Sequence, residues 1–465
     1  MFESLDAQQT LTANQKKLIV AGGLGVLLEF LDYFLIGFIL TFVAKPWGLT
    51  MGKSSSILLS SGAGAIAGAF FFGLLADRIG RRLVFLSTIA VFTLGTSAMV
   101  FTPDSPDTGW IYLTAMRFLV GFGAGGLYCV DLPLVQEFMP SRLRARVSGL
   151  ITSMVPFSFL MGSALVALLS SHIGWRGLLI ICVAFSLATL FLRRWIPESP
   201  RWLIQQGRSE EARKSMAWAL EVDVDSLAPI MLEPKESQPK VGLKDLFRYP
   251  RSLAVSWISN LGIQTGYYGL TLWSPTLLVV FLGVSPQKAA VYMIFITCCA
   301  FAGRIVQSFF MEWFGRRLAG ILSGGITVIA MLVVALLGNT VLTTPELFLI
   351  CLGIIYFFGE GGFAVIGPYS AEVWPSSLRT TGMGSAYGFG GIGKVLGPLG
   401  LALLVGTDVS LTTSAAIQPS IAFMYFSVWY LMLALAFVFF GIETRGRSIE
   451  EIDASLRNSA SKSQA

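Results

Sequence analysis

Glu29 and Asp32 are two carboxyl residues in the segment EFLDYFLIG, inside an apolar run from Leu18 to Val43. Three positions apart on a helix, they share one face, so their side chains would interact and titrate together. Such a pair suits a group that takes up and releases a proton. The alternatives are a carboxylate held permanently by a nearby Arg or Lys, or one that caps a helix kink. We expect Asp32, with Glu29, to handle protons.

Arg117, Glu360 and Arg304 are further ionisable residues inside apolar runs, where such groups are functional candidates. Arg117 does not release its proton, so when buried it needs an anion, either a protein carboxylate or a substrate. Glu360 could pair with Lys394 or serve as a second protonatable group. Arg304 lies about two turns from a basic loop, and we expect it to be partly structural.

Lys394 lies in GFGGIGKVLGP, near the middle of the apolar run 382–405. An ammonium at that depth, with glycines that allow close approach, is a reasonable clamp for a substrate carboxylate. The alternative is a salt bridge with Glu360 or Asp32, and we favour anion binding. Aromatic side chains could stack on a flat substrate, although packing is the ordinary role of each; the candidates are Tyr33, Tyr267, Tyr268, Trp273 and Tyr356.

The elements that position these residues are membrane-spanning helices. The 465 residues are 54% hydrophobic and 13% charged, with a mean hydropathy of +0.71, which excludes an ordinary soluble protein. Apolar runs long enough to span a bilayer as helices recur twelve times, at 18–43, 55–76, 83–101, 110–136, 147–170, 176–195, 252–281, 287–308, 318–338, 347–369, 382–405 and 421–441.

Basic residues gather in alternate loops, and the loops between them carry few. The positive-inside rule therefore places both termini and the long middle loop in the cytoplasm. The net charge of +6 follows from this asymmetry and needs no nucleic acid as a partner.

The chain also repeats itself. The segment GLLADRIGRR (73–82) returns as SFFMEWFGRR 235 residues later, and EFMPSRLRA (137–145) returns as EVWPSSLRT at the same offset. We expect an N-terminal six-helix bundle (1–202), a cytoplasmic linker (203–250) with a short amphipathic helix in SEEARKSMAWALEV, a C-terminal bundle (251–445) and a tail (446–465). At this offset Glu29 and Asp32 correspond to Gln264 and Tyr267, which are free to contact substrate.

Four motifs in this order resemble the major facilitator superfamily. GLLADRIGRR resembles its loop between helices 2 and 3, RFLVGFGAGG its helix 4, and PESPRW and ETRGRSIEEI the sugar-porter signatures after helices 6 and 12. EFLDYFLIG is similar to the D-x-x-D pattern of aromatic acid:proton symporters, with Glu29 in place of the first Asp. YYGLTLWSPTLL resembles helix 7 of those symporters and of niacin and organic-ion transporters. Only Gln264 remains of the sugar-porter glutamine pair in helix 7.

This resemblance implies an all-α membrane protein with twelve transmembrane helices in two pseudo-symmetric six-helix bundles, the major facilitator fold. It gives Arg117 a role in coupling or substrate binding. It also implies that charges at the cytoplasmic face latch the two halves while the outer side is open. The expected gating residues are Asp77, Arg78, Arg81, Arg82, Asp131, Glu137, Arg144 and their second set Glu312, Arg316, Arg317, Glu372 and Arg379.

The expected function is proton-coupled import of a small organic anion, an aromatic or related carboxylate, by alternating access. The expected form is a multi-pass monomer in a bacterial inner membrane. Protons and membrane lipids are its other partners; no cofactor, metal or catalytic residue is expected. The alternatives are a carrier of sugars, polyols or other neutral metabolites, an exporter, and a ligand sensor that does not transport. The glycine motifs at 121–126 and 388–394 lie inside spanning segments with no preceding strand, so they favour helix packing over nucleotide binding.

Overall fold

The computed structural model describes residues 2–227, 243–375, 378–411 and 418–446, together with residues 451 and 456. Nearly all of the described chain is helical, and its described residues form no strand. Part of the expected linker and most of the expected tail (446–465) lie outside the described residues.

The N-terminal half and the start of the linker form the helices α1 (Phe2–Asp6), α2 (Ala13–Val43), α3 (Met51–Ile79), α4 (Arg81–Val100), α5 (Gly109–Glu137), α6 (Ser141–Thr152), α7 (Met154–Arg193), α8 (Pro200–Gln205) and α9 (Ser209–Leu220). The C-terminal half forms α10 (Pro250–Leu282), α11 (Pro286–Phe314), α12 (Arg316–Leu336), α13 (Gly338–Thr343), α14 (Pro345–Glu372), α15 (Arg379–Gly391), α16 (Gly393–Val405) and α17 (Pro419–Phe440). Two short 3-10 helices cover Val224–Ser226 and Leu243–Arg248.

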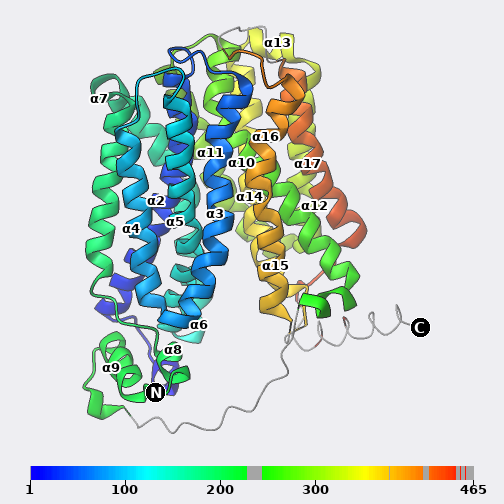
Figure 1. The fold of residues 1–465 in the computed structure, drawn as a ribbon. Helices are drawn as coiled ribbons and strands as arrows, with labels where there is room; N and C mark the ends of the chain where they lie inside the picture. The colour runs from blue at the N-terminus through cyan, green and yellow to red at the C-terminus, as the bar shows by residue number, and fades with distance from the viewer. Residues whose placement is uncertain are drawn as a thin grey trace.

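Nine helical stretches among the described residues are long and apolar enough to cross a membrane. One of them, Ser141–Arg193, is divided at Gly174, whose backbone is not helical (φ 64°, ψ −178°), and so supplies two spans. The long helices α5 and α10 complete the twelve spans that the sequence predicts. Figure 1 shows them as two bundles side by side, α2–α7 and α10–α17.

The two bundles are joined at one end and diverge at the other (Figure 1). The N-terminus, α8 and α9 lie at the diverging end, which we call the linker end. At the opposite end an isolated antiparallel bridge joins Thr50 to Ser410, and the Met51 amide donates to the Val409 carbonyl at 2.8 Å.

Two helices form the centre of the molecule. Every residue of α2 from 25 to 40, and of α10 from 262 to 278, is buried. A helix that is buried on all sides packs against neighbours around its whole circumference. The polar residues of α2 and α10 therefore face other helices, and these two elements position most of the candidate site.

The predicted amphipathic linker helix is confirmed as α9. Its acidic first turn carries Glu210 and Glu211, and its apolar face buries Met216 against Leu5 of α1. The Asn14 side chain at the start of α2 donates to the Trp218 carbonyl at 2.8 Å. These contacts attach the linker helix to the N-terminal half.

Candidate functional site

The structure brings Asp32 of α2 and Arg117 of α5 together as a buried ion pair, with side chains 2% and 1% exposed. The second guanidinium nitrogen, Nη2, donates to the Ser61 hydroxyl of α3 at 2.9 Å. Arg117 needs an anion when buried, and a protein carboxylate supplies it here. Glu29 lies one turn before Asp32 and is also buried. The N-terminal half therefore holds a buried carboxylate whose charge is balanced by a buried arginine.

Lys394 lies in the first turn of α16, directly after the break between α15 and α16 at Ile392, and it is 9% exposed. Its ammonium is 5.6 Å from the centroid of the Phe30 ring, 5.8 Å from Tyr33 and 5.0 Å from Tyr268. A cation within about 6 Å of aromatic faces is attracted by their quadrupoles. We call Phe30, Tyr33 and Tyr268 the aromatic cage.

Both halves build this cage, since Phe30 and Tyr33 belong to α2 and Tyr268 to α10. The Tyr268 ring stacks on Phe30 at 6.2 Å and meets Tyr33 edge-on at 5.5 Å. Close approach of α3 to α16 needs a glycine at position 62, where an added Cβ would lie 3.0 Å from the Lys394 backbone oxygen. Lys394 therefore lies where the two halves meet.

Glu360 of α14 does not pair with Lys394, as the sequence allowed, but with Arg304 of α11 at 2.8 Å. Arg304, expected to be partly structural, is thus part of a second acid–base pair. The guanidinium also lies 5.9 Å from the Phe363 ring centroid. The C-terminal half therefore holds a buried carboxylate of its own.

The remaining predicted substrate contacts lie on α10. Gln264 donates through Nε2 to the Tyr387 carbonyl at 3.5 Å, and its Oε1 is buried without a hydrogen-bond partner in the described part of the chain. Tyr267 lies 6.2 Å from Phe159 of α7 and 5.6 Å from Tyr356, measured between ring centroids. Trp273 is fully buried, and its Nε1 donates to the Pro398 carbonyl at 3.3 Å, which joins α10 to α16.

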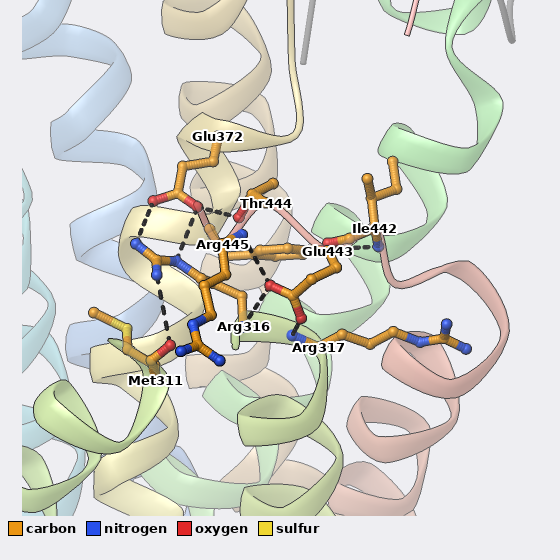
Figure 2. A network of polar contacts seen from close by, with 9 residues as sticks. Met311, Arg316, Arg317, Glu372, Ile442, Glu443, Thr444 and Arg445 are labelled. Atoms are coloured by element: carbon orange, nitrogen blue, oxygen red, sulfur yellow. Dashed lines mark hydrogen bonds and ion pairs between the residues drawn. The ribbon is translucent and has the colours of Figure 1, made fainter. Parts of the chain in front are cut away.

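At the linker end, Glu372 and Glu443 organise the turn between α11 and α12 (Figure 2). Glu372 accepts from Arg316 Nε at 3.2 Å and Nη2 at 3.3 Å, and the Thr444 hydroxyl donates to the same carboxylate. Glu443 accepts from the backbone amides of Arg316 at 3.0 Å and Arg317 at 3.1 Å. A carboxylate at this position satisfies the free N–H groups at the start of α12 and opposes its positive dipole end.

The N-terminal half repeats this network. Arg81 pairs with Glu137, and the Ser199 hydroxyl donates to Glu137. Glu198 accepts from the amides of Arg81 at 2.9 Å and Arg82 at 3.1 Å, at the start of α4. The turn residues before these helices, Gly80 and Gly315, have φ of 102° and 92°, a region that favours glycine.

The other predicted gating residues are placed as follows. Arg78 and Glu312 are exposed, and Arg144 donates through Nε to the Met139 carbonyl at 3.0 Å. Arg379 begins α15 and is partly buried. The side chains of Asp77 and Asp131 lie outside the described part of the structure.

A family model described as sugar (and other) transporter matches residues 18–456. The chain belongs to this family, within the major facilitator superfamily. The transporter is similar to the niacin transporter NiaP of Acinetobacter baylyi, with 30% identity over 92% of this chain and 94% of that protein. It is 24% identical to the cis,cis-muconate transport protein of the same organism, over 82% of this chain and 85% of that protein.

The fold of the transporter is similar to that of the xylose transporter XylE of E. coli in a partially occluded inward-open conformation. The TM-score is 0.71, and the match covers 94% of this chain and 100% of that chain at 16% identity. The likeness shows the fold. Together with the apolar helices, the family identifies a multi-pass integral membrane transporter and not an enzyme.

Sequence reasoning did not assign Glu198 and Glu443 to the charge networks at the linker end, whose other members are predicted gating residues. Both residues lie in the quoted motifs PESPRW and ETRGRSIEEI, but they are 245 residues apart, not 235. A search for charges at the single repeat offset therefore misses them. The neighbours Ser199 and Thr444 share this second offset and contact equivalent glutamates.

Proposed function

We propose that the protein is a proton-coupled symporter that imports a small organic anion, an aromatic or related carboxylate, by alternating access. The observation that carries this proposal is Lys394 inside the aromatic cage at the contact between the two halves. An ammonium surrounded by ring faces suits a flat ligand with a carboxylate. The named activities of the niacin and muconate transport relatives support the same substrate class.

Asp32 is the proposed proton-binding group, with Glu29 beside it. When the Asp32 carboxylate takes up a proton, its attraction for Arg117 weakens and the helix packing between α2 and α5 can change. Arg117 keeps its charge throughout, because a guanidinium does not titrate in the relevant range. Proton binding thus acts on the same helix, α2, that supplies two rings of the aromatic cage.

The linker end is the proposed cytoplasmic face, as the distribution of basic loops indicates. Because the bundles are joined at the opposite end and diverge at this one (Figure 1), the proposed conformation is inward-open. The Arg81–Glu137 and Arg316–Glu372 networks each lie within one half here. In the outward-open state, the two networks would face each other and latch the halves. The proposed setting is a bacterial inner membrane, with the protein as a monomer among its lipids.

Uptake into proteoliposomes tests this function. Purified protein should accumulate labelled nicotinate or benzoate when an inward proton gradient is imposed, and should equilibrate it without one. Lys394→Gln should weaken carboxylate affinity at least about tenfold, the loss of one charge-assisted contact of about 1.5 kcal/mol. Lys288→Gln, which changes an exposed lysine at the start of α11, is the matched control.

Three results would refute the proposal. Accumulation of labelled sugars or polyols with no carboxylate uptake would identify a carrier of neutral metabolites, the function that the family description also permits. Carboxylate transport that ignores the proton gradient would remove the role of Asp32. Outward, gradient-driven movement would identify an exporter.

A further inference from the structure

Two acid–base pairs inside the helix bundles stand out among the described residues, and they differ in solvent exposure. Asp32 and Arg117 are both sealed, at 2% and 1% exposure, and the guanidinium is also held by Ser61. In the second pair Glu360 is 1% exposed, whereas Arg304 is 17% exposed. Arg304 is therefore the more accessible partner of the second pair.

The bond between Arg304 and Glu360 has one contact, from Nη1 to Oε1 at 2.8 Å. The other oxygen, Oε2, is buried with no hydrogen-bond partner in the described part of the chain. Bidentate pairing is the stronger arrangement for arginine and carboxylate. The single contact leaves the carboxylate replaceable by another anion.

Tyrosine hydroxyls surround Glu360 from three helices. Tyr267 of α10 and Tyr430 of α17 lie within electrostatic range of its carboxylate. Both hydroxyls are buried, and the Tyr267 hydroxyl lies close enough to the Glu360 carboxylate to interact with it as a hydrogen-bond donor. Tyr356, on α14 itself, donates to the Ser274 hydroxyl at 2.7 Å. With Arg304 of α11, these are the titratable groups that face Glu360.

A row of aromatic rings connects this pair to the aromatic cage. The Tyr268 ring, 5.0 Å from the Lys394 ammonium, lies 5.7 Å from the Phe363 ring. Phe363 in turn lies 5.9 Å from the Arg304 guanidinium carbon. The Tyr268 and Phe363 rings, tilted by 52° to each other, thus lie in a row between two cations, and this row matches a flat ligand with an anionic group at each end.

We propose that Arg304 and Glu360 form a second anion subsite that is linked to a proton. A second carboxylate of the substrate replaces the Glu360 carboxylate at the Arg304 guanidinium, and Glu360 takes up one proton from the aqueous phase. The ligand class is an aromatic dicarboxylate, whose first carboxylate lies at Lys394. This inference rests on the proposed function, because it extends the same central site.

Charge conservation explains the link. A buried arginine that loses its carboxylate without replacement leaves an unpaired charge, which is strongly unfavourable. Protonation of Glu360 and arrival of a ligand carboxylate at Arg304 therefore favour each other. If binding of the second carboxylate takes up one proton, the affinity for that carboxylate falls about tenfold for each pH unit above the titration range of Glu360.

The test uses pairs of ligands that differ in one charge. Terephthalate is compared with its monoamide, and biphenyl-4,4′-dicarboxylate with its monoamide, so that two spacings are sampled. Binding to the purified full-length protein is measured by calorimetry from about pH 6 to 8, where carboxyl groups of ordinary pKa near 4 are ionised. The ratio of the dicarboxylate affinity to the monoamide affinity isolates the contribution of the second carboxylate, because any proton uptake at Asp32 affects both ligands equally.

For the wild-type protein, the ratio of dicarboxylate to monoamide affinity should exceed one at low pH for at least one of the two carboxylate spacings. The ratio should fall as pH rises. Glu360→Gln, which stands in for the protonated acid, should keep the ratio high and independent of pH. Arg304→Gln should lower the ratio by at least about tenfold, the loss of a charged contact of about 1.4 kcal/mol or more. Arg176→Gln, which removes an arginine from the Asp104 pair at the opposite end, is the control.

The double variant Arg304→Gln/Glu360→Gln guards against misfolding of the single variants, because it leaves no unpaired buried charge. Its ratio should match that of Arg304→Gln. A wild-type ratio near one, or one that does not change with pH for either spacing, would overturn the subsite while carboxylate transport stands. If no carboxylate binds the wild-type protein at all, the proposed function fails, and the subsite fails with it.

Discussion

Asp32→Asn is the substitution for which the structure gives the clearest expected magnitude. The Arg117 guanidinium is 1% exposed and has Asp32 as its carboxylate partner. Asn keeps a side-chain oxygen that can accept from the guanidinium, so the hydrogen bond can survive while the charge is lost. Two unit charges about 4 Å apart at an effective dielectric constant of about 20 attract each other by about 4 kcal/mol. We expect a loss of stability of this order.

The double variant Asp32→Asn/Arg117→Gln separates the pair from its individual charges. Removing one partner leaves an uncompensated buried charge, and removing both leaves two neutral amides that can bond to each other. We therefore expect the melting temperature in detergent to fall by several degrees for each single variant and to recover in the double variant. Ser56→Ala is a mild control. Ser56 lies on the same helix as Ser61, but its hydroxyl donates to the Gly52 carbonyl of that helix and not to the ion pair.

The same variant has a transport phenotype. Asp32→Asn should still exchange labelled for unlabelled carboxylate across a proteoliposome membrane, since exchange requires no net proton movement. It should lose accumulation driven by a proton gradient. An Asp32→Asn protein as stable as the wild type would refute the electrostatic argument, and one that still accumulates substrate against its gradient would refute the coupling role.

Two further substitutions, each with a control variant, test the turn before α4 and the aromatic cage. Gly80→Ala should destabilise the protein by about 1–3 kcal/mol, because φ 102° with ψ 155° is a glycine region and the new Cβ would lie 2.4 Å from Glu198 Oε2. Gly73→Ala is the control, because its Cβ would meet nothing within 4 Å, and it should leave the melting temperature nearly unchanged. Equal losses of melting temperature for Gly80→Ala and Gly73→Ala would contradict the argument from the backbone conformation of Gly80. Tyr268→Leu should weaken the binding of an aromatic carboxylate about fivefold, because it removes a ring contact of about 1 kcal/mol. Tyr268→Phe keeps the ring and should keep the affinity. Calorimetry on both variants checks this, and equal losses of affinity would show that the hydroxyl matters instead of the ring.

The sequence predicts the helices and the repeated turns before α4 and α12 well because their signals are local or repeated. Spans are visible as apolar runs, and Gly80 and Gly315 recur with their basic neighbours at a fixed offset. The linker helix α9 is visible from its acidic first turn and apolar periodicity. Each of these features depends on a short stretch of chain, so periodicity and composition are sufficient.

The partners of the buried charges could not be predicted in the same way. Asp32 and Arg117 are 85 residues apart, and Arg304 and Glu360 are 56 apart. Which cation meets which carboxylate depends on helix packing and rotation, and single-sequence patterns do not fix these. The sequence therefore identifies ionisable residues in apolar runs as candidate site residues, but it does not identify their partners. For Arg304, which lies near a basic loop, it predicts a partly structural role.

The placement of the pairs bears on how the halves can move. Asp32 and Arg117 both belong to the N-terminal half, and Glu360 and Arg304 both belong to the C-terminal half. Breaking a buried ion pair costs about 3–5 kcal/mol, so a rocking motion that separated such partners would meet a large barrier. With each pair inside one half, the halves can turn as bodies, while ring contacts such as Phe30–Tyr268 and Phe159–Tyr267 are remade between them. Each ring contact contributes only about 0.5–1.5 kcal/mol. In the proposed transport cycle, a ligand that lies between these rings and binds Lys394 therefore needs only a modest binding energy to shift the balance between the inward-open and outward-open conformations.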